Sequence, residues 1–469
     1  MSHSPENIKQ IWHQKYADAP KTLAQMSKID TLAAAFNVNV DSIIKISGKD
    51  LSEKIKEYGL SLAELQNTDY KKISSAKDIY RGIFRCFSLG IAEEWVAEDK
   101  AVYDWMKQHL GTKKLQMGAQ AGIIANTLSL SGIQKVVTHT ASLPELQAEQ
   151  FFKRENLLSF DENGNLKPAY RINRPQDQAS IHWIIEFDKD DKAEVEGTEI
   201  ICPKSNRFIA TYDPMLFNLV IDDNFVKYTN ENPVNCIILS GYQALSSANN
   251  GVALVEKTIP IIKKWKQKPE HPLIHLEIAS TQDKEVRKAV VEKIVPLCDS
   301  CGLNERETID LLEVLGYKDL AEKCNRETTP SNLWQALKIL KQETGCPRIQ
   351  LHMFGLYMTA ADKDFCLSAK DNLKGMILAA TAAASKASIG KLSEPSDILA
   401  SVGQDINHIG INALNELAEA VGNQQLLTDG FCETEDFTLI AVPTIIIDKP
   451  KTLVGMGDTI SAFSLLGAL

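Results

Sequence analysis

The segment that decides the fold lies close to the C-terminus, where residues 437–461 read FTLIAVPTIIIDKPKTLVGMGDTIS. Residues 437–447 form an apolar, β-branched run of strand length, and Gly455 and Gly457 follow it just before an apolar helical stretch. A strand that leads through a glycine-containing turn into a helix is typical of α/β proteins. The segment therefore predicts the last strand and the last helix of an α/β fold.

The same alternation of short apolar runs and longer helical periodicities extends back along the chain. It predicts strands at residues 31–36, 135–139, 236–240, 273–279, 293–296, 348–354 and 437–447. Helices are predicted at residues 284–291, 305–315, 331–341, 371–385 and 412–420. Strands that alternate with helices pack as a mostly parallel sheet with helices on both faces, so we expect a doubly wound α/β fold.

Two regions interrupt this alternation. Residues 37–117 are charged and irregular, and residues 180–212 contain closely spaced strands at residues 181–187, 199–202 and 207–211. Hairpin-like spacing within an α/β chain indicates an inserted sheet. We therefore expect a smaller, discontinuous, β-rich lid domain made of residues 37–117 and 171–212. The large α/β domain would comprise residues 1–36, 118–170 and 213–469.

The composition excludes several classes of protein. A formal net charge of -10 argues against a nucleic-acid or anionic-membrane partner, because both need clustered basic residues. No apolar stretch reaches the roughly 18 residues of a transmembrane helix, and the polar residues 1–14 do not resemble a secretory signal. The nine scattered cysteines are typical of a reduced, cytoplasmic protein. Cys298 and Cys301 form a C-x-x-C pair, but a zinc site would need a second pair.

The glycine-containing turn at residues 455–458 is suited to phosphate chemistry. Gly455 and Gly457 let the backbone approach a ligand closely, and the amides at the start of the following helix attract anionic oxygens. Asp458 lies at the same place, where its carboxylate could accept the proton of a hydroxyl that attacks a phosphoryl group. The alternative interpretation is that Asp458 caps the helix.

Two further groups of polar side chains follow predicted strands. Asn37, Asn39 and Asp41 alternate, so they share one face of an extended segment and could bind sugar hydroxyls; a capped turn is the alternative. His275 and Glu277 share one face near the end of a strand. Asn304 and Glu307 have the N-x-x-E spacing of a capping box, and this competes with a binding role.

The order of short motifs along nearly the whole chain resembles that of the ADP-dependent sugar kinases, the glucokinase and phosphofructokinase group of the ribokinase-like superfamily. The matching segments besides GMGDTIS are AFNVNVD (35–41), MGAQAGIIAN (117–126), LPELQAE (143–149), SNRF (205–208), LSGYQAL (239–245), IHLEIAS (274–280), GLNERE (302–307) and VPT (442–444). The resemblance implies a ribokinase-like large domain that binds the nucleotide, ADP as phosphoryl donor and at least one Mg²⁺ ion.

The resemblance also implies roles for individual residues. Glu277, Glu307 and Asp458 would hold Mg²⁺, largely through water, which suits a metal that prefers few carboxylates. Arg207 would clamp a phosphate from the lid, together with Gly455, Gly457 and the catalytic base Asp458. Asn37, Asn39, Asp41, Gly118, Gln120 and His182 would bind the sugar, and Asn304, His352 and Val442 would contact the nucleotide. Ala119 departs from the family pattern, which has a second glycine there.

The choice of sugar depends on residues 90–95, which read GIAEEW. They resemble the glucokinase pattern A-E-x-aromatic, whose Glu binds a sugar hydroxyl, and this assigns the role to Glu93. An alignment anchored on Gly90 would assign it to Glu94. A carboxylate accepts from a free hydroxyl and repels a substrate phosphate, so glucose is favoured over fructose 6-phosphate.

The sequence therefore predicts an ADP-dependent glucokinase that produces glucose 6-phosphate and AMP. The alternatives are an ADP-dependent 6-phosphofructokinase, an enzyme that accepts both sugars, and a catalytically silent sugar- or nucleotide-binding protein. No spacing in the sequence distinguishes ADP from ATP, and a monomer is compatible with the sequence.

Overall fold

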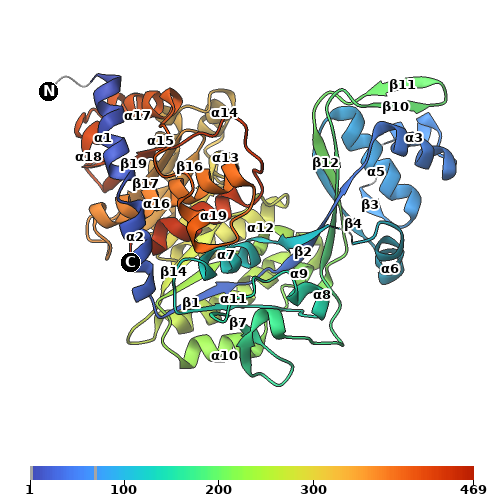
Figure 1. Cartoon of the computed structure of the whole chain (residues 1–469), viewed down its shortest axis with the longest axis horizontal. Coiled ribbons are helices and arrows are strands. Elements are labelled where there is room, and N and C mark those ends of the chain that lie inside the picture. The colour runs from blue at the N-terminus through green and yellow to red at the C-terminus, as the bar shows by residue number, and fades with distance from the viewer. Residues whose placement is uncertain (1–3, 68–70, 113) are drawn as a thin grey trace.

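The computed structural model describes residues 4–67, 71–112 and 114–469, which form one large and one smaller sheet with separate apolar cores. The smaller sheet and its helices project at the upper right of Figure 1, away from both ends of the chain. The predicted mixed α/β fold, with a central, mostly parallel sheet flanked by helices, is confirmed. The exact domain boundaries stay a prediction.

The large sheet has eleven strands. Their spatial order is β18 (Phe431–Glu433), β19 (Thr438–Pro443), β17 (Leu356–Ala361), β16 (Arg348–Met353), β15 (Ser300–Asn304), β14 (Leu273–Glu277), β13 (Cys236–Leu239), β1 (Thr31–Ala35), β6 (Lys135–Thr138), β7 (Leu157–Phe160) and β8 (Leu166–Pro168). The pairs from β16 across to β7 are parallel, and the pairs beyond them at both margins are antiparallel. The carboxyl ends of the parallel strands therefore share one edge, where ligands bind in open α/β sheets.

Three helices bring the glycine-containing turn at residues 455–458 to this edge. The helix α19 (Met456–Leu466) packs against α16 (Ala369–Ile389) and α7 (Gln120–Ser129). The close approach of α16 to α19 depends on Gly375, because a Cβ there would lie 2.1 Å from the carbonyl oxygen of Ser464. The predicted helices are confirmed as α12 (Lys284–Ala289), α13 (Glu305–Val314), α15 (Pro330–Thr344), α16 and α17 (His408–Val421).

The strand predicted at residues 293–296 is wrong. Those residues belong to the π-helix η5 (Val290–Ile294) and the 3-10 helix η6 (Val295–Leu297), and the strand is β15, a few residues later. Buried Val290, Val291 and Ile294 have helical rather than alternating spacing. The strand β15 reads SCGLN and lacks the β-branched residues that reveal a strand.

The smaller sheet has the order β3 (Lys72–Ile73), β4 (Glu93–Ala97), β12 (Asn206–Thr211), β9 (Ile181–Phe187), β2 (Asn39–Lys45) and β5 (Leu115–Gly118). Its core contains aromatic residues of α5 (Ala76–Leu89), such as Phe84 and Phe87, packed with Trp183 and Phe208 of the sheet. The prediction that residues 37–117 are irregular is wrong, because they contain α5, the helices α3 (Gly48–Glu57), α4 (Leu62–Gln66) and α6 (Lys100–His109), and four strands of this sheet.

The two remaining strands, β10 (Lys192–Val195) and β11 (Thr198–Ile201), form a separate antiparallel ribbon at the end of the smaller sheet. Within the part of the chain that the structure describes, no helix is both long and apolar enough to span a bilayer.

Candidate active site

A cleft of about 1060 Å³ lies between the two sheets and brings together residues that are far apart in the sequence. Its lining includes Asn39, Asp41, Gln116, His182 and Arg207 of the smaller sheet, and Gln120, Ala279, Gly455 and Asp458 of the large one. The large sheet contributes the edge where its parallel strands end. Most of the predicted sugar-binding and catalytic residues therefore face a common space.

The glycine-containing turn forms the start of α19. Gly455 is the N-cap residue in the left-handed conformation, with φ of 65°, so the alternative interpretation of Asp458 as the cap is wrong. A Cβ at Gly455 would lie 2.8 Å from Nζ of Lys386, and one at Gly457 would lie 3.2 Å from Nε2 of His352. A side chain at either glycine would come too close to Lys386 or His352. The amides of the first turn of α19 have no partner within the helix and remain available for anionic oxygens.

Lys386, near the end of α16, binds the glycine-containing turn at residues 455–458. Its ammonium donates to the carbonyl oxygen of Gly455 at 2.9 Å and to the Thr459 hydroxyl at 3.2 Å. Burial raises the pKa of Asp458 to about 6, although the charge of Lys386 and a bond from Gln120 oppose the rise. A carboxylate with a pKa of about 6 is ionised at neutral pH and is well matched to accept a proton there.

Three buried carboxylates lie close enough to influence one another: Glu277 at the end of β14, Glu307 in α13 and Asp458 in α19, of which Asp458 lines the cleft. Burial raises the pKa of Glu277 well above its usual range, and the charges of Glu307 and Asp458 raise it further. Burial likewise raises the pKa of Glu307 to about 8. Carboxylates that repel one another in a buried site favour a bound cation.

The three carboxylates do not form a closed metal site. Among the residues that the structure describes, no three His, Cys, Asp or Glu side chains converge closely enough to hold a metal by themselves. Glu307 also completes the capping box with Asn304, so that alternative interpretation is confirmed. The residues fit a hard cation such as Mg²⁺, which takes one or two carboxylates and completes its shell with water and phosphate oxygens.

The other end of the cleft is rich in amide and carboxylate groups. Asn39 donates to Nδ1 of His182 at 2.8 Å, and Nε2 of His182 lies 3.3 Å from Asp213. Burial alone would lower the pKa of His182, but the bond to Asp213 and the charges of Glu94 and Asp41 raise it above its usual value. Burial raises the pKa of Asp41 to about 6, against the opposing charge of His182.

Within the described part of the chain, several buried polar atoms at this end have no hydrogen-bond partner. They are Nδ2 of Asn37, Oδ1 of Asn39 and Oε1 of Gln120. Oδ1 of Asn37 accepts from the Ala121 amide in the first turn of α7, so Asn37 does cap a helix, yet its amino group remains free. Unpaired buried polar atoms are costly, and their grouping here indicates a ligand with both donors and acceptors.

Gly118 and Ala119 shape the floor of this end. A Cβ at Gly118 would lie 2.0 Å from Oδ1 of Asn39 and 2.2 Å from Oδ1 of Asp41. Ala119 precedes α7 with φ of 54° and ψ of 154°, a region that suits glycine. The departure from the glycine pattern therefore stores backbone strain within the cleft.

The predicted nucleotide contacts lie in three strands of the large sheet: Asn304 ends β15, His352 is in β16 and Val442 is in β19. His352 is nearly buried beside Gly457, and its Nδ1 has no hydrogen-bond partner among the residues that the structure describes. Val442 is 0% exposed within β19, whereas Phe354, in the turn after β16, is 65% exposed. Phe354 is therefore a large apolar surface available at this edge, and its backbone amide donates to Glu305 at 2.8 Å.

The chain is similar to known proteins over nearly its whole length. Residues 30–467 match the family model for the ADP-specific phosphofructokinase/glucokinase conserved region. The chain belongs to this family. It is an ADP-dependent sugar kinase, and the expectation drawn from its motifs is confirmed.

The relatives of this kinase include proteins named as phosphofructokinases and proteins named as glucose/glucosamine kinases. It is 28% identical to an ADP-specific phosphofructokinase of Methanosarcina acetivorans, over 98% of this chain and 97% of the relative. It is 29% identical to an ADP-dependent glucose/glucosamine kinase of Pyrococcus furiosus, over 97% and 98%.

Solved structures of similar proteins share the ribokinase-like fold. The reconstructed last common ancestor of the ADP-dependent phosphofructokinases from Methanosarcinales matches with a TM-score of 0.84 at 29% identity, over 99% of this chain and 98% of that one. An ADP-dependent kinase in complex with fructose-6-phosphate and ADPβS matches with a TM-score of 0.80 at 28% identity, over 97% of each chain.

The structure of this kinase separates Glu93 from Glu94. Neighbouring residues of a strand point to opposite faces, and Glu94 is aligned with Ile209 and Ile184 on the cleft face. The Thr211 hydroxyl donates to Glu94 at 2.7 Å. Glu93 instead forms ion pairs with Arg85 at 3.0 Å and Lys71 at 2.9 Å. Glu93 borders the cleft, but its carboxylate is already engaged by cations.

Arg207 lies on the same face of the smaller sheet as Asp41 and His182, in the strand β12 between β4 and β9. Its side chain is exposed and lines the cleft. An exposed guanidinium on the smaller sheet is free to reach a ligand that lies between the sheets.

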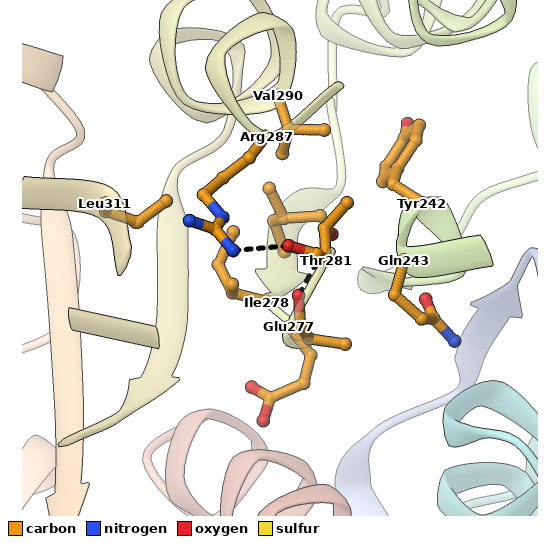
Figure 2. Close-up of a pocket in the computed structure, with 10 residues that line it drawn as sticks. Tyr242, Gln243, Glu277, Ile278, Thr281, Arg287, Val290 and Leu311 are labelled. Atoms are coloured by element: carbon orange, nitrogen blue, oxygen red, sulfur yellow. Dashed lines mark hydrogen bonds between the residues drawn. The ribbon is translucent and has the colours of Figure 1, made fainter. Parts of the chain in front are cut away.

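Sequence reasoning missed several residues that support the site. Asp213 follows β12 and binds His182, and Lys386 binds the turn before Asp458. Figure 2 shows a third, Arg287 of α12, whose guanidinium binds the carbonyl oxygen of Thr281 in the loop after β14 while Glu277 points away from it. Asp213 and Lys386 act on residues distant in sequence, whereas Arg287 is close in sequence to Thr281. Of the three, only the aspartate before Pro214, a typical helix start, carries a local signal.

Proposed function

We propose that this kinase transfers the terminal phosphoryl group of ADP to the 6-hydroxyl of glucose, in the presence of Mg²⁺, and releases glucose 6-phosphate and AMP. The observation that carries the choice of glucose is the carboxylate of Glu94 on the cleft face, close enough to Asp41 and His182 to influence their pKa values. A carboxylate accepts a hydrogen bond from a neutral sugar hydroxyl but repels a substrate phosphate.

The sugar would satisfy the unpaired atoms at this end of the cleft. The amino group of Asn37 would donate to a hydroxyl, and the oxygens of Asn39 and Gln120 would accept from others. Each buried atom that gains a partner removes a penalty of about 1–3 kcal/mol, which favours a polyhydroxylated ligand over an apolar one.

In the transfer step, Asp458 takes the proton of the 6-hydroxyl. The oxygen so released forms a bond to the terminal phosphorus of ADP as the bond between that phosphorus and the bridging oxygen breaks, and AMP leaves. The backbone amides at the start of α19 and the guanidinium of Arg207 would stabilise the charge on the transferring group. Closure of the cleft around the sugar would exclude water, which otherwise competes as acceptor.

Glu277, Glu307 and Asp458 are the residues that would hold Mg²⁺, with Asn304 fixing Glu307 and His275 lying beside Glu277. When bound, Mg²⁺ would neutralise charge on the phosphate oxygens of the donor. At the nucleotide edge, His352 and Asn304 would border the phosphates and Phe354 would cover the adenine ring, while Val442 packs beneath this edge.

The experiment that tests the choice of sugar compares Glu94→Gln with the matched control Glu93→Gln. We expect Glu94→Gln to lower kcat/KM for glucose by about 10-fold or more, because an ionic hydrogen bond of about 1.5–3 kcal/mol is lost. Glu93→Gln would leave glucose affinity nearly unchanged and lower thermal stability, because it breaks ion pairs within the smaller sheet. An equal effect of both substitutions on glucose would contradict the assignment.

Fructose 6-phosphate is the second candidate acceptor. The Methanosarcina acetivorans relative is named as a phosphofructokinase, and a solved structure of a similar kinase contains fructose-6-phosphate. In this chain Arg207 and Lys71 are cations of the cleft lining that could meet a substrate phosphate. A higher kcat/KM for fructose 6-phosphate than for glucose in the unmodified enzyme would favour this candidate.

A further inference from the structure

Gln147 is 0% exposed in the short helix α8 (Glu145–Ala148). On either side of it, Ala148 belongs to the core of the large sheet and Leu146 packs against the core of the smaller one. In Figure 1, α8 lies at the base of the strands that extend to the smaller sheet. A buried amide is costly unless it is hydrogen-bonded, so the partners of Gln147 indicate what it does.

The side chain of Gln147 binds three backbone groups. Its Nε2 donates to the carbonyl oxygens of Ser142 at 2.9 Å and Val38 at 3.3 Å, and its Oε1 accepts from the amide of Ser180 at 3.1 Å. The nitrogen of a side-chain amide only donates and the oxygen only accepts, so these partners fix the orientation of the amide.

Two of the three partners lie where the chain passes from the large sheet to the smaller one. Val38 is in the connection between β1 and β2, and Ser180 immediately precedes β9. The amide of Val40 donates to the carbonyl oxygen of Ser180 at 2.7 Å, so the two connections run side by side. Gln147 therefore ties both connections to α8.

A third connection joins the same cluster. Asp213 lies between β12 of the smaller sheet and the helix α9 (Pro214–Phe217). Its Oδ1 accepts from the Ser180 hydroxyl at 3.1 Å and from the amide of Leu216 at 3.0 Å. Three connections between the sheets therefore meet around Gln147 and Ser180, and the smaller sheet is anchored at this point.

The anchored connections carry side chains of the cleft. Asn39 directly follows Val38, His182 is two residues after Ser180, and both line the cleft. Nδ2 of Asn39 lies 2.8 Å from Nδ1 of His182. A shift of either connection therefore moves the sugar end of the cleft, whereas the described bonds of Gln147 reach none of the strands of the nucleotide edge.

We propose that Gln147 is a positioning residue: its amide holds the connections at Val38 and Ser180 together and so fixes Asn39 and His182 in the cleft. The expected effect on turnover rests on the proposed function, which assigns these two side chains to the sugar. The hold on the two connections does not depend on that function.

Two substitutions of Gln147 separate its bonds. Gln147→Met keeps a side chain of similar length and removes all three bonds. Gln147→Glu keeps an oxygen for the Ser180 amide, but an ionised carboxylate cannot donate to Val38. It therefore frees the first connection and retains the hold on the second.

Asn126→Leu is the matched control. Asn126 is 4% exposed in α7, and its amide group likewise binds backbone, donating to the carbonyl oxygen of Gln150 at 3.0 Å and accepting from the amide of Phe152 at 2.9 Å. Neither partner lies in a connection between the sheets. Asn126→Leu therefore removes a buried amide from the core without releasing the smaller sheet.

The first measurement is steady-state kinetics of the full chain with the sugar and Mg²⁺-ADP varied in turn. We expect kcat/KM for the sugar to fall on the order of 100-fold in Gln147→Met, because a displacement of about 1 Å in positioning groups has this effect, with little change in KM for Mg²⁺-ADP. Asn126→Leu should lower the unfolding temperature and leave kcat/KM for the sugar nearly unchanged.

The second measurement is hydrogen exchange by mass spectrometry on the same proteins without substrates. Exchange should be faster at residues 36–41 and 179–183 in Gln147→Met, mainly at residues 36–41 in Gln147→Glu, and at neither segment in Asn126→Leu. If Gln147→Met does not fold, Gln147→Glu compared with Asn126→Leu decides both measurements.

Unchanged exchange at both connections in the Gln147 variants would overturn the proposal. So would equal losses of kcat/KM for the sugar in Gln147→Met and Asn126→Leu, because the effect would then be one of core packing. An unmodified enzyme inactive toward both sugars would contradict the proposed function, and hydrogen exchange alone would then decide whether Gln147 holds the connections.

Discussion

Replacing Gly118 with alanine would put a methyl group among the side chains that we assign to the sugar. The new Cβ would lie 2.0 Å from Oδ1 of Asn39 and 2.2 Å from Oδ1 of Asp41, whereas a Cβ essentially never approaches another atom within 3.0 Å. One side must therefore move by about 1 Å. The backbone cannot do so freely, because Gly118 and Asn39 are directly paired between β5 and β2.

The expected magnitude follows from that displacement. A shift of about 1 Å in a positioning group lowers the rate by about 100-fold, and overpacking costs about 1–3 kcal/mol of stability. We expect kcat/KM for the sugar to fall by about 100-fold in Gly118→Ala, with little change in KM for Mg²⁺-ADP. Steady-state kinetics with each substrate varied in turn, and thermal unfolding, measure the two effects.

Gly316→Ala is a suitable control for this experiment. Gly316 has φ of 94°, and among the described residues no atom other than those of Gly316 and its chain neighbours lies within 4 Å of the added methyl group, so its substitution strains the backbone without touching the cleft. It should lower the unfolding temperature and leave kcat/KM for the sugar unchanged. A folded Gly118→Ala enzyme with unaltered kcat/KM for both sugars would refute the assignment of Asn39 and Asp41 to the acceptor site.

Three other substitutions test separate parts of the site. Asp458→Asn should lower kcat by about 100- to 10,000-fold, which is the usual contribution of a general base. The unmodified enzyme should lose activity as pH falls through about 6, because Asp458 becomes protonated. Retention of activity in Asp458→Asn would exclude Asp458 as the base. Ala119→Gly should raise the free energy of unfolding, measured by chemical denaturation, by roughly 1–3 kcal/mol, because it removes the strain at φ of 54°. An unchanged or lower free energy of unfolding would show that the backbone is not strained there. The pKa of Glu307 is raised from 4.5 to about 8, so its ionisation lowers the stability of the folded state as pH rises through that interval. Glu307→Gln should therefore raise the unfolding temperature of the Mg²⁺-free protein at pH 8.5 but hardly at pH 4.5. The reverse pH dependence would contradict this.

The parts of the site that the sequence predicts are those formed by neighbouring residues. The turn from Gly455 to Asp458 combines a preceding strand, two glycines and a following helix within one segment, so it was predictable from local pattern alone. The same holds for Asn39 and Asp41, which alternate within β2 and face the cleft together.

Features that depend on register or on distant elements were not predictable. Alternation shows that Glu93 and Glu94 face opposite sides of β4, but only the pairing of β4 with β12 shows that Glu94 faces the cleft. The strand β15 lacks a β-branched pattern, and the helical run before it imitates one. Lys386 reaches the site from α16, and no local motif marks it.

The central claim is phosphoryl transfer from ADP to a sugar, and its most direct test is turnover of the purified protein with glucose and Mg²⁺, with ADP and ATP compared as donors. We predict that glucose 6-phosphate and AMP form in equal amounts from ADP, that ATP does not replace ADP, and that Asp458→Asn slows the formation of both products by about 100- to 10,000-fold. Formation of glucose 6-phosphate from ATP alone, or the absence of AMP with either glucose or fructose 6-phosphate as acceptor, would contradict the account.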